Sequence, residues 1–393
     1  MLTNLAKITL MPKKILILFS DAGGGHRSAG EAIAEALTAQ YGADAQVQMV
    51  DMLKDYTPFP YNRLPGWYPE MTRHRRFWEL GWRLTNEAHL SRLSYMVVWP
   101  FVRQAVLRTI HDYPADAYVV VHWIYLTPLI KALGMRRLPV ITVITDLVSI
   151  HAWWCHPKSA LSLVPTEPAR ERLILYGVRP ERTQVVGLPV AARFCVPVGN
   201  KATLRAQLGW STERPVVLVM GGGEGTGPIY KIAQAISASG LDCELIVVAG
   251  RNESLCASLQ AATWQTPTHI YGFVREMPDF MRAADVLVTK AGPSTLSEAF
   301  NAGLPIIIYD FLPGQEDGNV GYVEQAGAGL WAPSPEAVVV ALRRWIGPTA
   351  EPQTLARAAL NAQKLARPEA ARRCAELIWQ SIHGRESEQV NDR

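Results

Sequence analysis

The chain has 393 residues, of which 49% are hydrophobic, and a formal charge of +4 from 39 basic and 35 acidic side chains. This length favours two or three domains, and the hydrophobic content is sufficient for sizeable cores. The composition excludes a disordered chain, a collagen and a coiled coil. The small charge excess does not by itself indicate a nucleic-acid binder.

Cysteine usage and hydropathy indicate the compartment. The five cysteines are odd in number and include no CxxC pair, which disfavours a disulfide scaffold or a zinc site and favours a reducing compartment. The first 20 residues lack the long apolar stretch and cleavage site of a secretory signal. No run in the chain approaches the roughly 18 apolar residues of a spanning helix. We therefore expect a soluble or peripheral protein, in the cytoplasm.

Short apolar runs alternate with amphipathic helical stretches along the chain. The first series predicts strands at 14–19, 47–50, 118–121, 140–144 and 161–164. The second series predicts strands at 216–220, 244–249, 269–271, 285–289 and 305–309. Such nearly continuous apolar runs are typical of parallel strands that are covered by helices on both faces. The pattern predicts an α/β protein with two doubly wound domains.

The domain boundary is expected between these two series of strands. The polar stretch 197–214 is the predicted linker, which leaves 1–196 as the N-terminal domain and 215–365 as the C-terminal domain. The charged tail 386–393 is expected to fray.

The segment 56–101 departs from the alternation of strands and helices. It holds 11 of the 34 aromatic residues of the chain, together with six arginines and only three glutamates. We interpret it as an insertion in the N-terminal domain, between the second strand and the next helix.

The first candidate site is the loop SDAGGGHRSA at 20–29, which follows a predicted strand and opens a helix. Gly24 and Gly25 allow a tight turn and a close backbone approach, and the first amides of the helix favour an anion. His26 lies in the first turn, where a neutral imidazole can act as a general base. The alternative is a dehydrogenase-like nucleotide turn with Asp51 on a ribose hydroxyl and His26 incidental. The glycine spacing does not fit GxGxxG, however.

A second glycine loop, MGGGEGTG at 220–227, follows the first strand of the second series. A turn alone does not require five glycines in seven residues, whereas a phosphate cradle does. The loop lacks the lysine of the GxxxxGK[ST] motif and is therefore not an NTPase P-loop.

A third motif, TKAGPSTLSEA at 289–299, again has the order of strand, glycine turn and helix. The turn contains Gly292, the hydroxyls and amides of Ser294 and Thr295 can bind phosphate, and Glu298 one turn later can reach a ribose diol. The alternative is a capping box formed by Thr295 and Glu298. Together with the glycine loop upstream, binding of a nucleotide diphosphate is the preferred interpretation.

The fourth motif, PGQEDGN at 313–319, follows the last strand of the second series. It places Gln315, Glu316 and Asn319 at the carboxyl end of that strand, where ligands bind in open α/β sheets. These side chains can hydrogen-bond sugar hydroxyls. The alternative is a solvated loop with Asp317 as a helix cap.

These four motifs, with VITDLVSIHAWWCHP at 143–157 and VVGLPV at 185–190, resemble the monogalactosyldiacylglycerol synthase branch of glycosyltransferase family 28, which is related to the MurG transferase. They occur in the right order over almost the whole chain. The resemblance implies a GT-B fold, in which two Rossmann-like domains face a cleft. It also implies that the last helix, at 366–385, returns to the N-terminal domain.

The resemblance implies an inverting transfer of galactose or glucose from a UDP-sugar to 1,2-diacylglycerol, with no cofactor and no metal. It implies that His26 is the catalytic base and that Asp146 supports the acceptor side or orients the base. The C-terminal domain would bind the donor. Its implied contacts are Gly222, Gly223, Gly225, Gly292, Ser294 and Thr295 for the diphosphate, Glu298 for the ribose, the backbone near Val274 for the uracil, and Gln315, Glu316 and Asn319 for the hexose.

The aromatic insertion gains a role from this resemblance, because diacylglycerol stays in the bilayer. Trp and Tyr favour the membrane interface, and arginine attracts anionic head groups. We predict that 56–101 forms the membrane-docking and acceptor-entry surface, with Trp67, Trp78 and Trp82 on it and with Gly24 and Gly25 on the acceptor side. The expected location is the cytoplasm, peripheral at the inner face of the cell membrane. The alternative is a helical subdomain that buries these rings.

Other functions stay open at this point. A polyprenyl-linked sugar, a sterol or a carotenoid fits the insertion as well as diacylglycerol does. A GT-B-like UDP-sugar epimerase would have no affinity for lipid, and a non-catalytic nucleotide-sugar-binding subunit would lack the base. A dehydrogenase is least favoured, because it would leave the second glycine loop unexplained.

Overall fold

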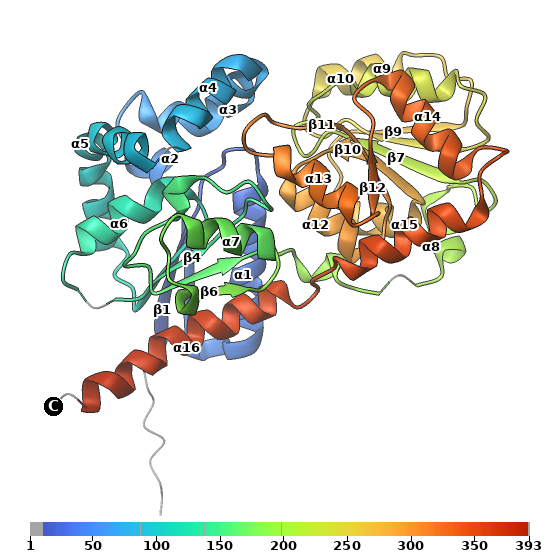
Figure 1. The fold of residues 1–393 in the computed structure, drawn as a ribbon. Helices are drawn as coiled ribbons and strands as arrows, with labels where there is room; N and C mark the ends of the chain where they lie inside the picture. Colours follow the sequence, from blue (N-terminus) through green and yellow to red (C-terminus); the bar gives the residue numbers. More distant parts are fainter. Residues whose placement is uncertain (1–10, 87, 137, 198, 392–393) are drawn as a thin grey trace, which may run out of the picture.

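The computed structural model describes residues 11–86, 88–136, 138–197 and 199–391, which form two α/β halves (Figure 1). Each half, as described, is built on a six-stranded parallel sheet with helices on both faces. The strand order is β2-β1-β3-β4-β5-β6 in the first sheet and β12-β11-β10-β7-β8-β9 in the second. The predicted fold class, two doubly wound α/β domains, is confirmed.

The N-terminal half contains the first six strands. They are β1 (Lys13–Leu18), β2 (Ala45–Val50), β3 (Ala117–Val120), β4 (Val140–Val143), β5 (Leu161–Val164) and β6 (Thr183–Val185). Its helices are α1 (Gly25–Tyr41), α2 (Met52–Tyr56), α3 (Leu64–Arg73), α4 (Arg75–Asn86), α5 (Ala88–Asp112), α6 (Leu126–Leu133) and α7 (Glu167–Leu175).

The C-terminal half repeats this organisation. Its strands are β7 (Val216–Met220), β8 (Glu244–Val248), β9 (Thr268–Tyr271), β10 (Val286–Lys290), β11 (Ile306–Asp310) and β12 (Gly329–Trp331). Its helices are α8 (Lys201–Leu208), α9 (Ile229–Ser237), α10 (Glu253–Gln260), α11 (Met277–Ala283), α12 (Pro293–Asn301), α13 (Asp317–Gln325), α14 (Pro335–Ile346) and α15 (Pro352–Lys364). The last helix is α16 (Ala370–Asn391).

The core of the N-terminal half follows from the alternation of side chains along β1. Ile15 and Ile17 pack on one face of the sheet, with residues of α1 and α16. Leu16 and Leu18 pack on the other face, with residues of α5 and α6. Successive strand residues point to opposite faces, so a strand that is covered on both sides must be apolar throughout. Burying each of these four side chains contributes about 1.5–3 kcal/mol.

The chain passes between the halves twice. The stretch 197–214, expected as a linker, contains α8, which is tied to the C-terminal half because Arg205 Nη2 lies 2.5 Å from Asp285 Oδ2. After α15 the chain crosses back, and α16 packs against α1 with the rings of Trp379 and Tyr41 stacked at 4.2 Å. Figure 1 shows α16 running beneath the first sheet.

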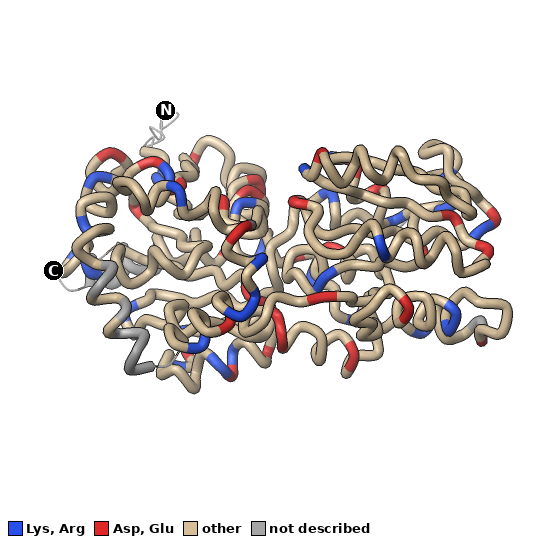
Figure 2. Tube along the Cα trace, turned by 90° about the horizontal axis from the view of Figure 1, so that it is seen from above, with Lys and Arg blue, Asp and Glu red and all other residues tan. Residues whose placement is uncertain are grey.

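The segment 56–101 is largely helical and lies between β2 and β3 in the chain. It comprises the end of α2, all of α3 and α4, and the first part of α5. Figure 1 shows α3 and α4 above the first sheet, on the side that faces the C-terminal half. Within the described residues, no helix combines the length and apolar character needed to cross a bilayer. Seen from above, acidic and basic residues are interspersed over both halves (Figure 2).

Candidate active site

The candidate site lies where the carboxyl ends of the two sheets meet. Strand order reverses between β1 and β3 in the first sheet and between β7 and β10 in the second, and ligands bind outside such switch points. A Cβ atom placed on Gly25 would lie 2.8 Å from the hydroxyl oxygen of Ser294. The N-termini of α1 and α12 therefore face each other, and their amides and dipoles form a site suited to an anion.

His26 lies in the first turn of α1 and is only 9% exposed. Its Nδ1 is 2.8 Å from the carbonyl oxygen of Val121, just beyond β3, and 2.7 Å from Thr145 Oγ1. A carbonyl oxygen can only accept, so Nδ1 carries the proton and Nε2 is left as the basic nitrogen. Burial lowers the pKa of His26 to about 4, against the opposing effect of the Val121 hydrogen bond. The imidazole is therefore neutral at pH 7.

Asp146 is 1% exposed and connects the two halves. Its Oδ2 accepts a hydrogen bond from Trp154 Nε1 at 2.7 Å, and its Oδ1 accepts one from Gln315 Nε2 at 3.0 Å. Burial raises the pKa of Asp146 to about 6, these hydrogen bonds oppose the rise, and the nearby charge of Glu316 adds to it. The carboxyl group therefore changes its charge near pH 6, within the pH range in which enzymes act.

The second glycine loop depends on backbone that only glycine tolerates. Gly225 has a φ of +59°, and a Cβ atom on it would lie 1.9 Å from the carbonyl oxygen of Ala249. Gly222 also has positive φ, and its Cβ position is 3.5 Å from the side chain of Lys290. The Cβ position of Gly223 is 3.3 Å from a guanidinium nitrogen of Arg251. The loop is thus flanked by two cations, which sequence reasoning did not assign to the site.

The third motif forms a helix N-terminus without a capping box. The N-cap of α12 is Gly292, with no side-chain cap, so Ser294 and Thr295 lie within the first turn. The alternative of a capping box formed by Thr295 and Glu298 is therefore wrong. Burial raises the pKa of Glu298 to about 8, opposed by the charge of Arg193. Glu298 is a partly buried carboxyl group at the predicted ribose position.

The predicted uracil position, Val274, is half-buried in the segment between β9 and α11. The adjacent Phe273 ring is exposed, and the guanidinium carbon of Arg251 lies 4.5 Å from its centroid. Arg251 also pairs with Glu224 of the glycine loop at 2.8 Å. The predicted uracil and diphosphate positions are therefore connected through one arginine.

In the fourth motif, some side-chain atoms hydrogen-bond to the backbone, and other side-chain oxygens have no hydrogen-bond partner among the described residues. Glu316 Oε2 accepts from the backbone N–H of Leu312 at 2.7 Å, and Asn319 Nδ2 donates to the carbonyl of Ala291 at 2.9 Å. Gln315 Oε1 and Asn319 Oδ1 are buried and have no hydrogen-bond partner among the described residues. Buried acceptors normally find a donor, and sugar hydroxyls can supply one.

The solvated-loop alternative for this motif is partly realised. Asp317 is exposed, but its carboxylate accepts a hydrogen bond from the backbone N–H of Gly314, and no side chain caps α13. Asp317 thus stabilises the turn that precedes the helix.

The three tryptophans of the insertion have different surroundings. Trp67 is 45% exposed, whereas Trp82 is only 6% exposed. Trp82 lies against Gly314 of the C-terminal half, because a Cβ atom placed on Gly314 would lie 2.5 Å from the indole. The ring centroid of Trp82 is 4.7 Å from that of His151. Trp78 is half-buried beside it. The expectation that Trp82 belongs to a docking surface is corrected, because Gly314 leaves the space that this indole fills.

Tyr68 of α3 is a further residue of the site that sequence reasoning missed. A Cβ atom on Gly23 would lie 2.9 Å from its ring. Burial raises its pKa, and the charges of Glu316 and Asp146 add to the rise. Tyr68 therefore contacts the first glycine loop and lies within electrostatic range of the carboxyl groups of the site. Its position in the aromatic run 56–101 was the only signal in the sequence.

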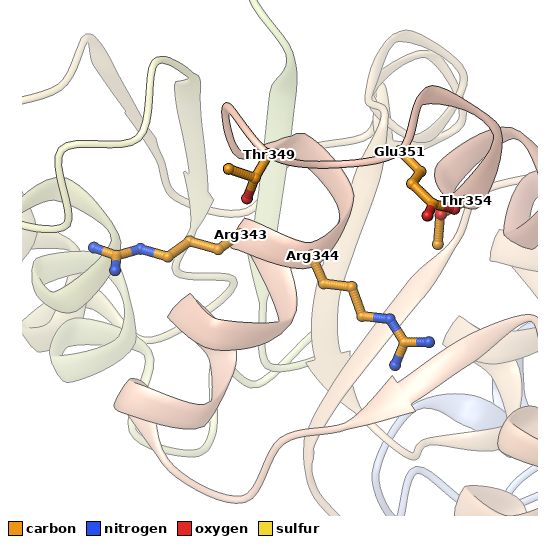
Figure 3. A pocket seen from close by; sticks show the side chains of 5 residues that line it. All are labelled: Arg343, Arg344, Thr349, Glu351 and Thr354. Carbon is orange, nitrogen blue, oxygen red and sulfur yellow. The ribbon is translucent and has the colours of Figure 1, made fainter.

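A separate pocket lies on the C-terminal half, around α14 and the start of α15 (Figure 3). Its lining residues are Arg343, Arg344, Thr349, Glu351 and Thr354. Figure 3 shows the two guanidinium groups pointing in different directions, and Arg343 donates to the carbonyl of Ser239 at 2.9 Å. This pocket contains none of the predicted site residues.

Two family models match the chain. The model described as monogalactosyldiacylglycerol (MGDG) synthase matches residues 26–190, and the glycosyltransferase family 28 C-terminal domain matches residues 216–373. A probable chloroplastic monogalactosyldiacylglycerol synthase of Glycine max is 37% identical over 375 residues, which cover 91% of this chain and 69% of the relative. The chloroplastic synthase of Spinacia oleracea is 35% identical over 396 residues, covering 95% and 74%.

Solved structures confirm the predicted GT-B fold. The MurG protein of Acinetobacter baumannii superposes with a TM-score of 0.61 at 16% identity and covers 94% of this chain and 100% of that one. The calicheamicin glycosyltransferase CalG4 superposes with a TM-score of 0.58 at 14% identity, covering 95% and 100%. At these identities the likeness extends to the fold alone.

The predicted location is overturned by the relatives. Those from Glycine max, Spinacia oleracea and Arabidopsis thaliana are all named chloroplastic, so the expected place at the inner face of the cell membrane is wrong. The family predicted from the motifs is confirmed, because the alignments cover nine tenths of this chain and more than two thirds of each relative. The chain belongs to the monogalactosyldiacylglycerol synthase family of glycosyltransferases.

Proposed function

We propose that this protein transfers galactose from UDP-galactose to the free hydroxyl of 1,2-diacylglycerol, with inversion at the anomeric carbon and without a metal ion. A UDP-sugar glycosyltransferase that makes a glycolipid from diacylglycerol follows from the family. The name of the relatives favours galactose over glucose. One observation carries the chemistry: His26 Nδ1 is bound to a carbonyl, which leaves Nε2 basic beside the facing N-termini of α1 and α12.

The proposed reaction is a single displacement. The acceptor oxygen bonds to the anomeric carbon while the bond from that carbon to the UDP oxygen breaks, and inversion follows from attack opposite the leaving group. The acceptor proton moves to His26 Nε2. UDP leaves with its electron pair, and the amides of α12 and the charge of Lys290 stabilise the developing negative charge. The bound diphosphate also favours the imidazolium ion, which burial alone disfavours.

Metal independence is part of this proposal. The residues that face the predicted diphosphate position are helix amides, Lys290 and Arg251, and these can supply positive charge to a leaving phosphate. The test is whether the reaction proceeds with a chelator present.

The direct test is glycolipid synthesis on liposomes that contain diacylglycerol, with UDP-galactose and UDP-glucose in parallel and a chelator throughout. We expect a β-linked monogalactosyl product, identified by mass spectrometry and by the anomeric coupling in NMR. Glucosyl product alone would overturn the choice of hexose, and activity only without chelator would overturn metal independence. Conversion of the UDP-sugar to an epimer without glycolipid would overturn the transferase.

We further propose that the insertion docks on the membrane through its exposed apolar side chains. These residues, here called the docking surface, are Phe59, Trp67, Met71, Phe77, Leu80, Leu84, Leu93, Met96 and Phe101. They lie on and around α3, α4 and α5, and Tyr68 of α3, whose ring is 2.9 Å from the Cβ position of Gly23, connects these helices to the first glycine loop. Exposed apolar groupings of this kind are typical of membrane or partner contacts.

Replacing Trp67 and Phe77 together by serine should weaken binding to anionic vesicles by at least about tenfold, since each ring removes apolar area that would otherwise leave water. These side chains are 45% and 78% exposed, so the folded protein should tolerate the change. Vesicle co-sedimentation measures the effect. Val340→Ser, which removes an exposed apolar side chain of α14 on the other half, is the control. Unchanged sedimentation of the double variant would contradict the docking surface.

A further inference from the structure

The insertion contacts the C-terminal half through an arginine at the start of α4. Arg75 Nη1 lies 2.5 Å from Asp310 Oδ1, and Arg75 Nη2 donates to the carbonyl oxygen of Phe311 at 2.7 Å. Asp310 is the last residue of β11, so the guanidinium group binds the end of a core strand. Two separate nitrogens engage two separate oxygens, a fork that a lysine ammonium cannot reproduce.

A second contact lies on the same helix. Trp82 follows Arg75 by seven residues, which is two helical turns, so the two side chains lie on one face of α4. Trp82 packs on Gly314, four residues beyond the Asp310 that Arg75 binds. One face of α4 therefore holds the segment 310–314 at both of its ends.

This segment leads directly into the predicted hexose-binding residues. Gln315 follows Gly314 and donates to Asp146, and Glu316 accepts from the backbone of Leu312 within the segment. Burial raises the pKa of Glu316, and the charge of Asp310 adds to the rise, whereas Lys290, the Leu312 N–H and, least of all, Arg75 oppose it. The position of the loop thus depends on contacts with a helix of the other half.

We propose that Arg75 is a positioning residue for the sugar donor: by gripping Asp310 and Phe311, it sets the loop 310–316 in the geometry that receives the hexose. The contacts of Arg75 and Trp82 then connect the insertion, which faces the lipid acceptor, to the loop that faces the donor sugar. This inference rests on the proposed function, because it assumes that the loop receives the hexose of a UDP-sugar. The competing role for an exposed arginine on this helix is attraction of anionic lipid.

Three variants separate these roles. Arg75→Lys keeps the charge but loses the fork, Asp310→Asn keeps the shape of the partner but loses its charge, and Arg76→Lys is the matched control at the next position of α4. We expect Arg75→Lys and Asp310→Asn each to raise the KM for UDP-galactose by about 5- to 30-fold, the range of a partly exposed charge-assisted pair. Vesicle binding and the KM for diacylglycerol should stay unchanged, and Arg76→Lys should resemble the wild type.

The pair should also behave as a unit. The double variant Arg75→Ala/Asp310→Ala should raise the KM for the donor no more than the worse of the single variants Arg75→Ala and Asp310→Ala, because either change alone breaks the contact. Additive effects would overturn the proposal. So would a wild-type donor KM in Arg75→Lys, or a loss of vesicle binding in Arg75→Ala that Asp310→Asn does not share. Thermal unfolding of each variant shows whether a loss reflects the fold.

Calorimetric binding of UDP-galactose to the full-length protein without lipid keeps this test separate from the proposed reaction. If the wild type makes no galactolipid, the proposed function fails, yet weaker donor binding by Arg75→Lys and Asp310→Asn would still support the positioning role. If the wild type is active and both variants bind the donor as tightly as it does, the positioning role alone fails.

Discussion

Replacing His26 by alanine should lower kcat for glycolipid formation by about 100- to 10,000-fold, the usual contribution of a general base. Nε2 is the nitrogen left to take the acceptor proton, because Nδ1 is committed to the carbonyl of Val121. Binding of UDP-galactose should change little, since the backbone amides of α1 and α12 remain in place. Initial rates on liposomes and calorimetric donor binding measure the two effects.

The matched control for this experiment is Thr145→Val. Thr145 Oγ1 lies 2.7 Å from Nδ1 of His26, but the Val121 carbonyl alone can hold the ring and its tautomer. We expect a loss of no more than about tenfold, since one neutral hydrogen bond contributes about 0.5–1.5 kcal/mol. If His26→Ala retained more than a tenth of wild-type kcat, His26 would not be the base.

Replacing Asp146 by asparagine should remove the acid limb of the pH profile near pH 6. In the wild type, kcat/KM should fall as the pH drops through about 6, because Asp146 becomes neutral there and we expect its carboxylate to favour the imidazolium ion that forms on His26. Trp154 links the two groups, since it donates to Asp146 and its ring lies 6.5 Å from that of His26. In Asp146→Asn the next fall should come near pH 4, where His26 itself becomes protonated.

The rate of this variant at pH 7 should be lower by about tenfold or more, while Trp154 and Gln315 keep their contacts. The side-chain carbonyl of the new asparagine can accept the hydrogen bond from Trp154. If the Gln315 amide rotates by half a turn, its Oε1, which has no partner among the described residues, can accept a hydrogen bond from the asparagine amino group. Profiles of kcat/KM from pH 4 to 9 measure the effect. A limb that stays at pH 6 in the variant would assign it to another group.

Stability should change in the opposite direction to activity. Burial raises the pKa of Asp146 in the folded protein to about 6, above the 3.8 of a free aspartate, so the neutral carboxyl contributes stability below about pH 4 that is lost as the pH rises through 6. The loss amounts to up to about 3 kcal/mol. Asp146→Asn avoids this loss, because asparagine does not ionise, and the variant should be at least as stable as the wild type at pH 7. Chemical unfolding at pH 4 and pH 7 tests this, and destabilisation at pH 7 would indicate a structural role.

Local sequence patterns predicted ten of the twelve described strands and missed the two shortest. The ten predicted strands occur within about two residues of their expected bounds. Most of them are apolar runs buried on both faces, whereas β2 and β9 at the sheet edges are partly exposed. Both sheets end on three-residue strands that were not predicted, β6 and β12. Such short runs carry too few side chains to show a period, and their pairing depends on the neighbouring strand.

The two doubly wound sheets, the glycine turns after β1, β7 and β10, and the family could all be predicted from local sequence, because each turn is a local unit of strand, glycine and helix. The contacts between side chains of the two halves could not be predicted in this way. Gln315 donates a hydrogen bond to Asp146 although the two residues are 169 positions apart in the sequence, and Arg75 binds Asp310 across 235 positions. Likewise, Trp82 is buried because Gly314 comes to lie opposite it. Such contacts carry no period or spacing in the sequence, since they depend on how two independently patterned sheets pack across the site.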